Sequence, residues 1–163
     1  MIDAETRDLS IRVLEACRAR KWTLATAESC TGGLVAGALT EIAGSSDVVD
    51  RAFVTYSNAA KMAMLGVPDA TLAAHGAVSR QTAEAMAQGA LTRAGVDLTV
   101  SITGIAGPGG GSAGKPVGLV HFAAAAKDRR LIHREKRYGD IGRAEVRRLA
   151  VIEALAMLLE LAA

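Results

Sequence analysis

The segment TLATAESCTGG, residues 23–33, places reactive side chains where a predicted strand meets two glycines and a helix should begin. Backbone N–H groups in the first turn of a helix lack internal partners and carry partial positive charge. A Ser29 hydroxyl at such a turn can attack a carbonyl carbon while neighbouring amides stabilise the oxyanion. The simpler interpretation is that Ser29 or Thr31 only caps the helix. Cys30 is an alternative nucleophile, because thiols at helix starts are often reactive.

A serine nucleophile needs a base, and Lys61 in the segment TYSNAAKMAML is the candidate that the sequence offers. Tyr56 and Lys61 flank a predicted strand-to-helix turn, so both side chains could face one cleft. Small and apolar neighbours favour burial, which lowers the pKa of a lysine because desolvation penalises its charged form. The alternative is an ordinary surface lysine. No motif indicating a catalytic triad accompanies the three histidines, His75, His121 and His133.

The glycine-rich segment GIAGPGGGSAGKP, residues 104–116, is the third candidate for chemistry. From Gly109 to Lys115 it almost matches a phosphate-binding P-loop. Pro116 replaces the Ser or Thr that would hold magnesium, and a strand is predicted to follow instead of a helix. We therefore expect no nucleotide triphosphatase. The loop could still approach an anion with its backbone amides, or it could be a flexible connection.

Positive charge is concentrated in residues 127–148, which hold nine of the nineteen Lys and Arg residues against four acids. The segment is either a solvated edge strand and helix start or a local anion site. The net charge of +2 is too small to indicate nucleic-acid or membrane binding by bulk charge. The chain has only one Trp, two Tyr and two Phe, so stacking on single-stranded nucleic acid is not expected.

The 163 residues suit one compact domain, and we expect a single domain over residues 1–163. The N-terminus lacks the apolar core of a signal peptide, and no apolar run approaches the ~20 residues of a membrane helix. Cys17 and Cys30 show no metal-ligand spacing, and no disulfide is expected between them. The composition therefore predicts a cytoplasmic protein without a bound metal and without membrane association.

Apolar periodicity predicts the elements that must position these side chains. Helices are expected over 3–20, 32–44, 58–65, a short turn from 68, 79–95 and a closing stretch through 146–159; strands are expected over 23–27, 51–57, 97–103, 117–126 and 130–138. In 97–103, Leu98, Val100 and Ile102 share one face. The last two strands are close enough to form a hairpin with a charged edge. The pattern predicts an α/β fold, a three-layer α/β/α domain with a mixed sheet of about five strands, and ligands in such sheets bind beyond the strand ends.

Five motifs together resemble the C-terminal domain of the CinA family. They are TAESCTGG, FVTYSNAAK, HGAVS, SITGIAGPGGG and KPVGLVHFA, and their order and spacing cover the chain from about Asp8 to Leu159. The resemblance implies a CinA C-terminal-domain-like fold. It also implies an amidase, free of metal and cofactor, that converts nicotinamide mononucleotide and water to nicotinic acid mononucleotide and ammonia in pyridine-nucleotide recycling. Longer family members carry an additional N-terminal domain, whose activity is not expected here.

The resemblance also implies roles for individual residues. Ser29 falls on the nucleophile of the family, and Tyr56 and Lys61 fall on the residues that activate it. The substrate-binding set comprises Cys30, Thr31, Gly32 and Gly33, whose amides would hold the oxyanion, with Thr103 and Gly104 in the substrate loop and Arg147 near the phosphate. Arg143 and Arg148 compete with Arg147 for that last role. Glu28 either orients Lys61 or makes a structural hydrogen bond. A homodimer or higher homo-oligomer is expected.

Two rival functions remain open from the sequence. The first is an amidase or peptidase that uses the same Ser–Lys pair on another substrate. The second is a non-catalytic nucleotide-binding or regulatory module of the same fold, which would bind a ligand without turnover. The joint presence of Ser29, Tyr56 and Lys61 argues against the second.

Overall fold

The structure is a computed structural model that describes residues 2–163. Its helices are α1 (Ala4–Arg20), α2 (Leu34–Thr40), α3 (Asn58–Leu65), α4 (Asp69–His75), α5 (Arg80–Ala94) and α6 (Arg143–Ala162), with a short 3-10 helix at Ser45–Asp47. Its strands are β1 (Leu24–Glu28), β2 (Val49–Val54), β3 (Leu98–Gly104), β4 (Leu119–Ala126) and β5 (Leu131–Arg137).

The five strands form one mixed sheet in the order β2-β1-β3-β4-β5. Strands β2, β1 and β3 are parallel, whereas β4 runs antiparallel to β3 and β5 antiparallel to β4. Strands β4 and β5 form the predicted hairpin, and the charged strand β5 lies at the edge. The predicted α/β class and the mixed five-stranded sheet are confirmed.

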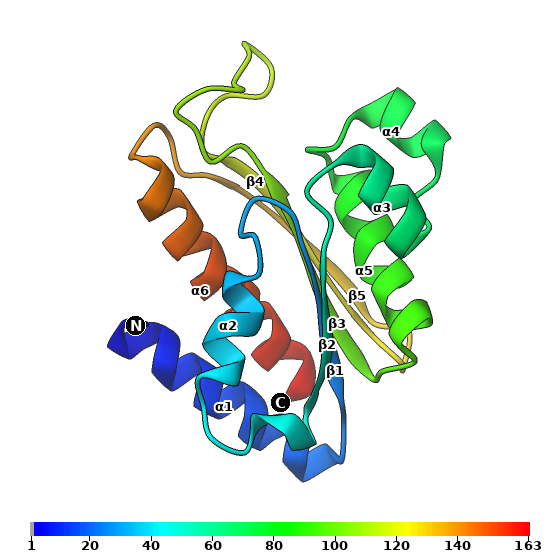
Figure 1. Ribbon diagram of the computed structural model, residues 1–163, viewed down its shortest axis with the longest axis vertical. Helices are drawn as coiled ribbons and strands as arrows, with labels where there is room; N and C mark the ends of the chain where they lie inside the picture. The colour runs from blue at the N-terminus through cyan, green and yellow to red at the C-terminus, as the bar shows by residue number, and fades with distance from the viewer. Residues whose placement is uncertain (1) are drawn as a thin grey trace.

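Helices cover both faces of this sheet, as Figure 1 shows. Helices α1, α2 and α6 lie on one side, and α3, α4 and α5 lie on the other. Helix α6 packs on β3 and β4 and is itself covered by α1, whereas α5 packs on β1, β3 and β4. The main hydrophobic core lies between the sheet and the layer of α1 and α6. The result is the predicted three-layer arrangement.

Strand β3 is buried on both faces, and its alternating sequence reflects two different neighbours. The apolar residues Leu98, Val100 and Ile102 belong to the main core. On the other face, the hydroxyls of Thr99 and Ser101 donate to backbone carbonyls of α5. Small hydroxyl side chains and the alanines of α5 let the helix approach the strand closely, and each buried hydroxyl finds an acceptor.

Several predicted boundaries differ from the structure. Strand β2 begins at Val49, before the predicted residue 51, and α2 ends at Thr40, before the predicted residue 44. Strand β2 ends at Val54 and not at residue 57, because Ser57 is the N-cap of α3 and its side chain accepts from the N–H of Ala60. Helix α2 begins at Leu34 and not at residue 32, because Gly32 and Gly33 have φ values of 58° and 100°. These left-handed conformations cannot continue a helix and favour glycine.

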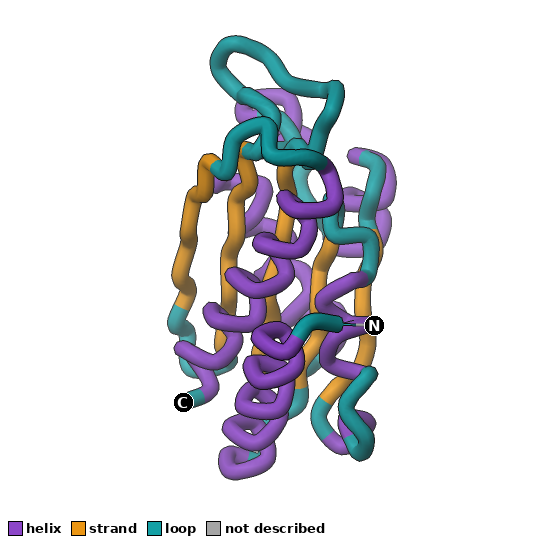
Figure 2. Tube along the Cα trace, turned by 90° about the vertical axis from the view of Figure 1, so that its left-hand side faces the viewer, coloured by secondary structure: helices purple, strands orange, loops and turns teal. Residues whose placement is uncertain are grey.

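The carboxyl ends of β1, β2 and β3 lie at the same edge of the sheet. After β1 the chain passes to α2 on one face, and after β2 it passes to α3 on the other. Diverging connections of this kind leave a crevice beyond the strand ends. The glycine-rich loop after β3 projects beyond the sheet at this end (Figure 2). Within residues 2–163, no helix is long and apolar enough to cross a membrane.

Candidate active site

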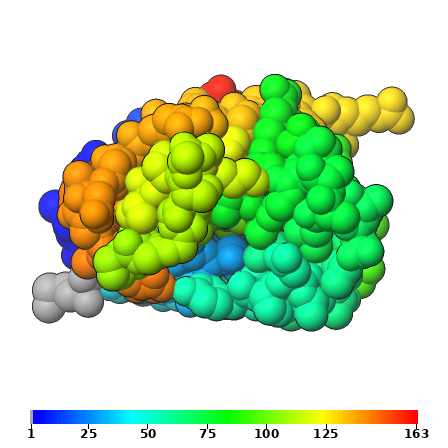
Figure 3. Space-filling model, turned by 90° about the horizontal axis from the view of Figure 1, so that it is seen from above, coloured from blue at the N-terminus to red at the C-terminus, as the bar shows by residue number. Residues whose placement is uncertain are grey.

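A cavity of about 280 Å³ lies at the carboxyl edge of the parallel strands. Figure 3 shows a hollow there, bounded by the glycine-rich loop on one side and by α3 and its neighbouring loops on the other. Its lining comes from Ser29 and Cys30 after β1, Tyr56, Asn58 and Lys61 around the start of α3, Ala77 and Val78 before α5, residues 103–107, 109 and 110 after β3, and Arg143 of α6. Five separate segments of the chain therefore meet at one site.

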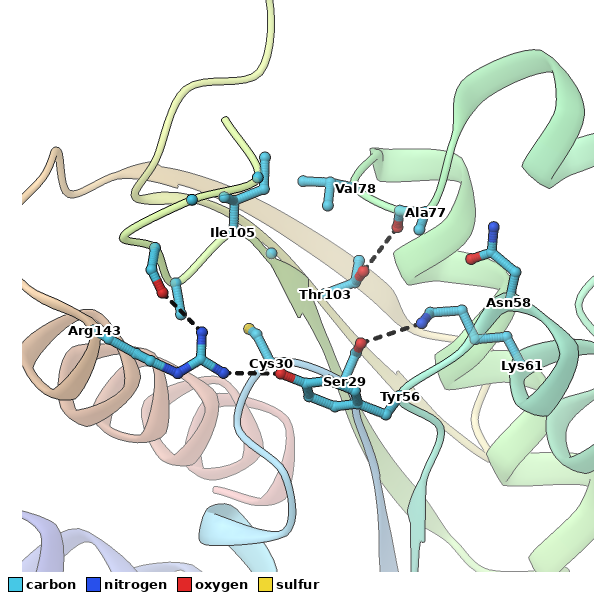
Figure 4. Close-up of a pocket in the computed structure, with 15 residues that line it drawn as sticks. Ser29, Cys30, Tyr56, Asn58, Lys61, Ala77, Val78, Thr103, Ile105 and Arg143 are labelled. Carbon is cyan, nitrogen blue, oxygen red and sulfur yellow. Dashed lines mark hydrogen bonds between the residues drawn. The ribbon is translucent and has the colours of Figure 1, made fainter. Parts of the chain in front are cut away.

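Ser29 and Lys61 are in direct contact on one wall of this cavity (Figure 4). The Lys61 ammonium donates to Ser29 Oγ at 3.1 Å and to the carbonyl oxygen of Thr55 at 2.9 Å. Lys61 is only 1% exposed, and its burial lowers the pKa of the amine. Among residues 2–163, no carboxylate lies within ion-pair distance of Lys61 to restore that pKa. The arrangement suits an amine that loses its proton and then accepts one from Ser29.

Tyr56 lies at the rim of the cavity and is 61% exposed. Its hydroxyl accepts a hydrogen bond from Arg143 Nη2 at 2.8 Å. In the described part of the chain, the Tyr56 hydroxyl has no hydrogen bond to Ser29 or Lys61. Lys61 is therefore the group in place to act as the immediate proton acceptor, and Tyr56 belongs to the wall around Arg143.

Cys30 is next to Ser29, but the burial of its thiol disfavours the reactive, ionised form. It is 5% exposed, and burial raises the pKa of its thiol to about 11. A thiol with that pKa carries almost no thiolate at neutral pH, and the thiolate is the nucleophilic form. Both cysteines are free thiols. The structure therefore favours Ser29 over Cys30 as the nucleophile.

Glu28 is fully buried and accepts five hydrogen bonds. Three come from backbone N–H groups of Gly33, Val35 and Ala36, at 3.2, 3.0 and 3.0 Å. The other two come from the hydroxyls of Thr26 and Thr31, at 3.0 and 2.7 Å. No hydrogen bond joins Glu28 to Lys61. Glu28 thus satisfies the unpaired amides at the start of α2, and its role in this structure is to fix the turn that carries Ser29.

The cap changes which amides are free for an oxyanion. The N–H of Gly33 is bound to Glu28, and the N–H of Gly32 donates to the carbonyl oxygen of Ser29 at 2.9 Å. Neither Gly32 nor Gly33 lines the cavity, and nor does Thr31. Of the expected amides from Cys30 to Gly33, that of Cys30 belongs to a residue that lines the cavity and has no acceptor within residues 2–163. The glycines shape the turn.

Replacing Glu28 should destabilise the fold strongly. Glu28→Ala leaves three buried donors without their acceptor, namely the Val35 N–H and the hydroxyls of Thr26 and Thr31. Each such loss costs roughly 1–3 kcal/mol, so we expect the free energy of unfolding to fall by at least about 3 kcal/mol. Urea unfolding measures this. Glu41→Ala is the control, because Glu41 makes a 3.7 Å exposed ion pair with Arg7 beyond the end of the same helix. Equal stability of the two variants would contradict the capping role.

Thr103 and Gly104, which the resemblance assigns to the substrate loop, line the cavity. The Thr103 hydroxyl donates to the carbonyl oxygen of Ala77 at 2.7 Å, so it ties the end of β3 to the loop before α5. Several lining residues were not predicted as site residues, namely Asn58, Ala77, Val78 and the loop residues 105–107, 109 and 110. Asn58 lies three positions before Lys61 on α3, and that spacing alone places it on the same helix face.

The basic segment divides into paired and unpaired cations. Counting partners among residues 2–163, six of the nine have a carboxylate within 4.0 Å, and the three that have none are Arg129, Arg143 and Arg147. Arg129 lies in the β4–β5 hairpin, at the opposite end of the sheet. Arg143 lines the cavity and donates to the carbonyl oxygen of Gly107 at 2.8 Å.

Arg147 and Arg148 lie outside the cavity lining. Arg147 donates to the carbonyl oxygens of Cys30 and Thr31, at 3.1 and 3.3 Å. Arg148 is bound to Glu145 and Asp3 on the surface. Of the three arginines that the sequence analysis considered for the phosphate, Arg143 is the one that lines the cavity, one helical turn before Arg147 on α6.

None of the three histidines lines the cavity. His121 and His133 contact each other, with Nδ1 and Nε2 2.9 Å apart. His75 ends α4, and its carbonyl oxygen accepts from Lys115 at 2.6 Å. Across residues 2–163, no three His, Cys, Asp or Glu side chains gather in a way that could hold a metal ion. Lys61 thus remains the base candidate at Ser29.

Comparison with known proteins places this geometry in context. The family model described as the CinA C-terminal domain matches residues 6–162. Proteins titled nicotinamide-nucleotide amidohydrolase PncC are 54% identical in Escherichia coli K12, over 95% of this chain and 93% of that protein, and 51% identical in Enterobacter agglomerans, over 85% and 84%. The crystal structure of the competence/damage inducible protein CihA from Agrobacterium tumefaciens superposes with a TM-score of 0.97 at 56% identity, covering 99% of this chain and 98% of that one.

Proposed function

The chain belongs to the CinA C-terminal domain family, and from that premise we propose that it hydrolyses the carboxamide of nicotinamide mononucleotide to nicotinic acid mononucleotide and ammonia. The observation that carries this proposal is the buried 3.1 Å contact between Lys61 Nζ and Ser29 Oγ in a cavity that Arg143 also lines. The relatives titled nicotinamide-nucleotide amidohydrolase support the choice of substrate. We propose one amidase domain over residues 1–163, acting in pyridine-nucleotide recycling.

The first half-reaction is the acylation of Ser29. Neutral Lys61 accepts the hydroxyl proton while Ser29 Oγ forms a bond to the carboxamide carbon, and the carbonyl oxygen becomes an oxyanion. When the tetrahedral intermediate collapses, the C–N bond breaks and the protonated Lys61 donates its proton to the departing nitrogen. Ammonia leaves, and the nucleotide remains on Ser29 as an ester.

The second half-reaction releases the acid. Lys61, neutral again, accepts a proton from a water molecule whose oxygen attacks the ester carbon. The C–O bond to Ser29 breaks, and Lys61 returns the proton to Ser29 Oγ. The balance is one amide and one water consumed, and one carboxylic acid and one ammonia formed. The carbonyl oxygen of Thr55 keeps the Lys61 amine in place at 2.9 Å throughout.

The far side of the cavity suits the anionic end of the substrate. Figure 4 shows Arg143 on the opposite side of Ser29 from Lys61. Its guanidinium donates to a carbonyl and a hydroxyl, and no acid within residues 2–163 forms an ion pair with it. Charge-assisted hydrogen bonds to a phosphate are among the strongest that a protein makes. We propose that the nicotinamide ring spans the cavity, with the carboxamide at Ser29 and the phosphate at Arg143 and the adjacent glycine-rich loop.

Ammonia release from a panel of amides tests this proposal. Nicotinamide mononucleotide should be turned over, whereas nicotinamide riboside, which lacks the phosphate, should lose about ten- to a hundredfold in kcat/KM, because one charge-assisted hydrogen bond contributes roughly 1.5–3 kcal/mol. Arg143→Ala should lose a similar factor on the mononucleotide and little on the riboside. Lys136→Ala, which removes an edge-strand cation, should leave both values unchanged. Equal rates of the wild type on the two compounds would remove the phosphate site from the account.

The same panel separates the rival functions. A Ser–Lys amidase of another substrate would release ammonia from a different compound at a higher kcat/KM than from the mononucleotide. A non-catalytic module would bind the mononucleotide without releasing ammonia. The buried, unpaired Lys61 beside Ser29 favours turnover, because a binding module gains nothing from the desolvation cost of that amine.

A further inference from the structure

We infer that Arg147 is a positioning residue, which holds the turn after Ser29 by its carbonyl oxygens and so places the Cys30 N–H where it can stabilise the oxyanion. This inference rests on the proposed function and deepens its mechanism. It gives Arg147 a different role from Arg143: Arg143 faces the substrate, whereas Arg147 acts on the protein backbone from behind the catalytic turn.

The contacts of Arg147 are all to this turn. Nε donates to the carbonyl oxygen of Cys30 at 3.1 Å and Nη2 to that of Thr31 at 3.3 Å. No carboxylate within residues 2–163 lies at ion-pair distance from Arg147. The positive charge is therefore directed at two backbone carbonyls without an acid to neutralise it. Hydrogen bonds from a charged donor are stronger than those between neutral groups.

This hold acts on the residue of the turn that offers a free amide to the cavity. The N–H of Cys30 has no acceptor in the described residues, whereas those of Gly32 and Gly33 do. Cys30 lines the cavity, whereas Thr31 is fully buried and lies outside its lining. Arg147 binds the carbonyl oxygen of Cys30 itself and that of the next residue, so it fixes the orientation of the residue that carries this amide.

The turn is shaped to admit the guanidinium. A Cβ at Gly32 would lie 3.4 Å from Arg147 Nη2, and the backbone there has a φ of 58°. Glycine at position 32 therefore permits both the left-handed backbone and the close approach of the Arg147 guanidinium. The charge also reaches the site itself, because Arg147 partly opposes the rise in the pKa of the Cys30 thiol that burial causes. Glu28 fixes the helix side of the turn, and Arg147 fixes the opposite side.

The expected signature is a loss of kcat with little change in KM. Removing one oxyanion donor from an acyl-transfer enzyme costs about 10²–10³ in kcat, and weakening one should cost about ten- to a hundredfold. We therefore expect Arg147→Ala to lower kcat on nicotinamide mononucleotide by that factor, with KM within about threefold of wild type. Arg147→Lys should be intermediate, because one ammonium cannot span both carbonyls as a guanidinium does. Ethylguanidinium, below unfolding concentrations, should restore part of the Arg147→Ala rate.

A transition-state mimic separates this role from a merely structural one. In the aldehyde analogue of nicotinamide mononucleotide, an aldehyde replaces the carboxamide. Ser29 Oγ adds to the aldehyde carbon and forms a hemiacetal, whose oxygen lies where the oxyanion forms. Its affinity should fall in Arg147→Ala by the same factor as kcat, whereas the affinity for the product acid should not. Arg148→Ala is the matched control on the same helix, since that side chain is bound to Glu145 and Asp3, and it should match wild type in both measurements. If Arg147→Ala does not fold, Arg147→Lys carries the comparison.

Three results would overturn the inference. The first is a folded Arg147→Ala whose kcat stays within about threefold of wild type. The second is a loss confined to KM and larger for the mononucleotide than for the riboside, which would make Arg147 a phosphate ligand. The third is a fall in kcat without a fall in aldehyde affinity. Failure of the proposed function is distinguishable from all three, because then the wild-type protein itself releases no ammonia.

Discussion

Ser29→Ala is expected to abolish ammonia release from nicotinamide mononucleotide, with kcat lowered by at least about 10⁴-fold, because removing the nucleophile of a serine hydrolase leaves only binding and oxyanion stabilisation. The hydroxyl lies 3.1 Å from Lys61 Nζ, and both residues line the cavity. The fold should remain intact, because Lys61 keeps its bond to the Thr55 carbonyl and Glu28 keeps the cap of α2. Circular dichroism and thermal unfolding check this.

Cys30→Ala is the matched control for the nucleophile. The thiol is adjacent in sequence and lines the same cavity, but its pKa is raised to about 11 by burial. We expect Cys30→Ala to keep most of the wild-type activity. The serine mechanism would be ruled out by a Ser29→Ala enzyme with full turnover, and it would be replaced by a cysteine mechanism if Cys30→Ala were the inactive variant.

Lys61→Arg is expected to be nearly as inactive as Lys61→Ala, with kcat/KM lowered by about 10²–10⁴-fold, the usual contribution of a general base. Arginine keeps the positive charge and much of the length of lysine, but its pKa above 12 means that it is effectively never neutral. A lysine that only holds charge would tolerate this change. Substrate binding, measured by calorimetry, should be largely preserved in both variants.

The pH dependence of kcat/KM in the wild-type enzyme tests the role of Lys61 as the base independently. Below the pKa of Lys61 the amine is protonated and cannot accept the Ser29 proton, so kcat/KM should rise with pH and level off above that pKa. Because burial lowers this pKa, the single ionisation should lie below ~10.4, the ordinary value for lysine. A Lys61→Arg enzyme within about tenfold of wild type would exclude Lys61 as the base. The search would then move to Tyr56, because no histidine lines the cavity.

Much of the fold follows from local signals in the sequence. Helix α3 has the predicted bounds, 58–65, because Ser57 caps its start and Gly66 adopts the left-handed conformation at its end. The charged strand β5 was predicted at an edge and lies there, since Lys and Arg side chains discourage further pairing. The predicted ends of β2 and α2 were less accurate. They depend on a helix cap and on two left-handed glycines, which the periodicity of apolar residues does not reveal.

The site was less predictable where it depends on how distant elements meet. Arg143 and Arg147 are one turn apart on α6, and sequence cannot decide which of them reaches a cavity and which reaches the turn behind it. The role of Glu28 could not be predicted without the position of α2, because its carboxylate oxygens accept hydrogen bonds from backbone amides up to eight residues away. The buried state of Lys61 depends on the packing of α3 against α5. The reactive residue types were visible in the motifs, whereas their partners were not.

The central claim is that Ser29 forms an ester with the nucleotide during turnover, and mass spectrometry of the acid-quenched reaction tests it most directly. The enzyme is mixed with excess nicotinamide mononucleotide, quenched during turnover, digested, and the peptide that contains Ser29 and Cys30 is fragmented. The account predicts that this peptide carries the nicotinoyl ribose phosphate acyl group on Ser29, that Cys30→Ala carries the same adduct, and that Lys61→Arg carries none. An acyl group on Cys30, or full turnover by Ser29→Ala without an adduct, would contradict it.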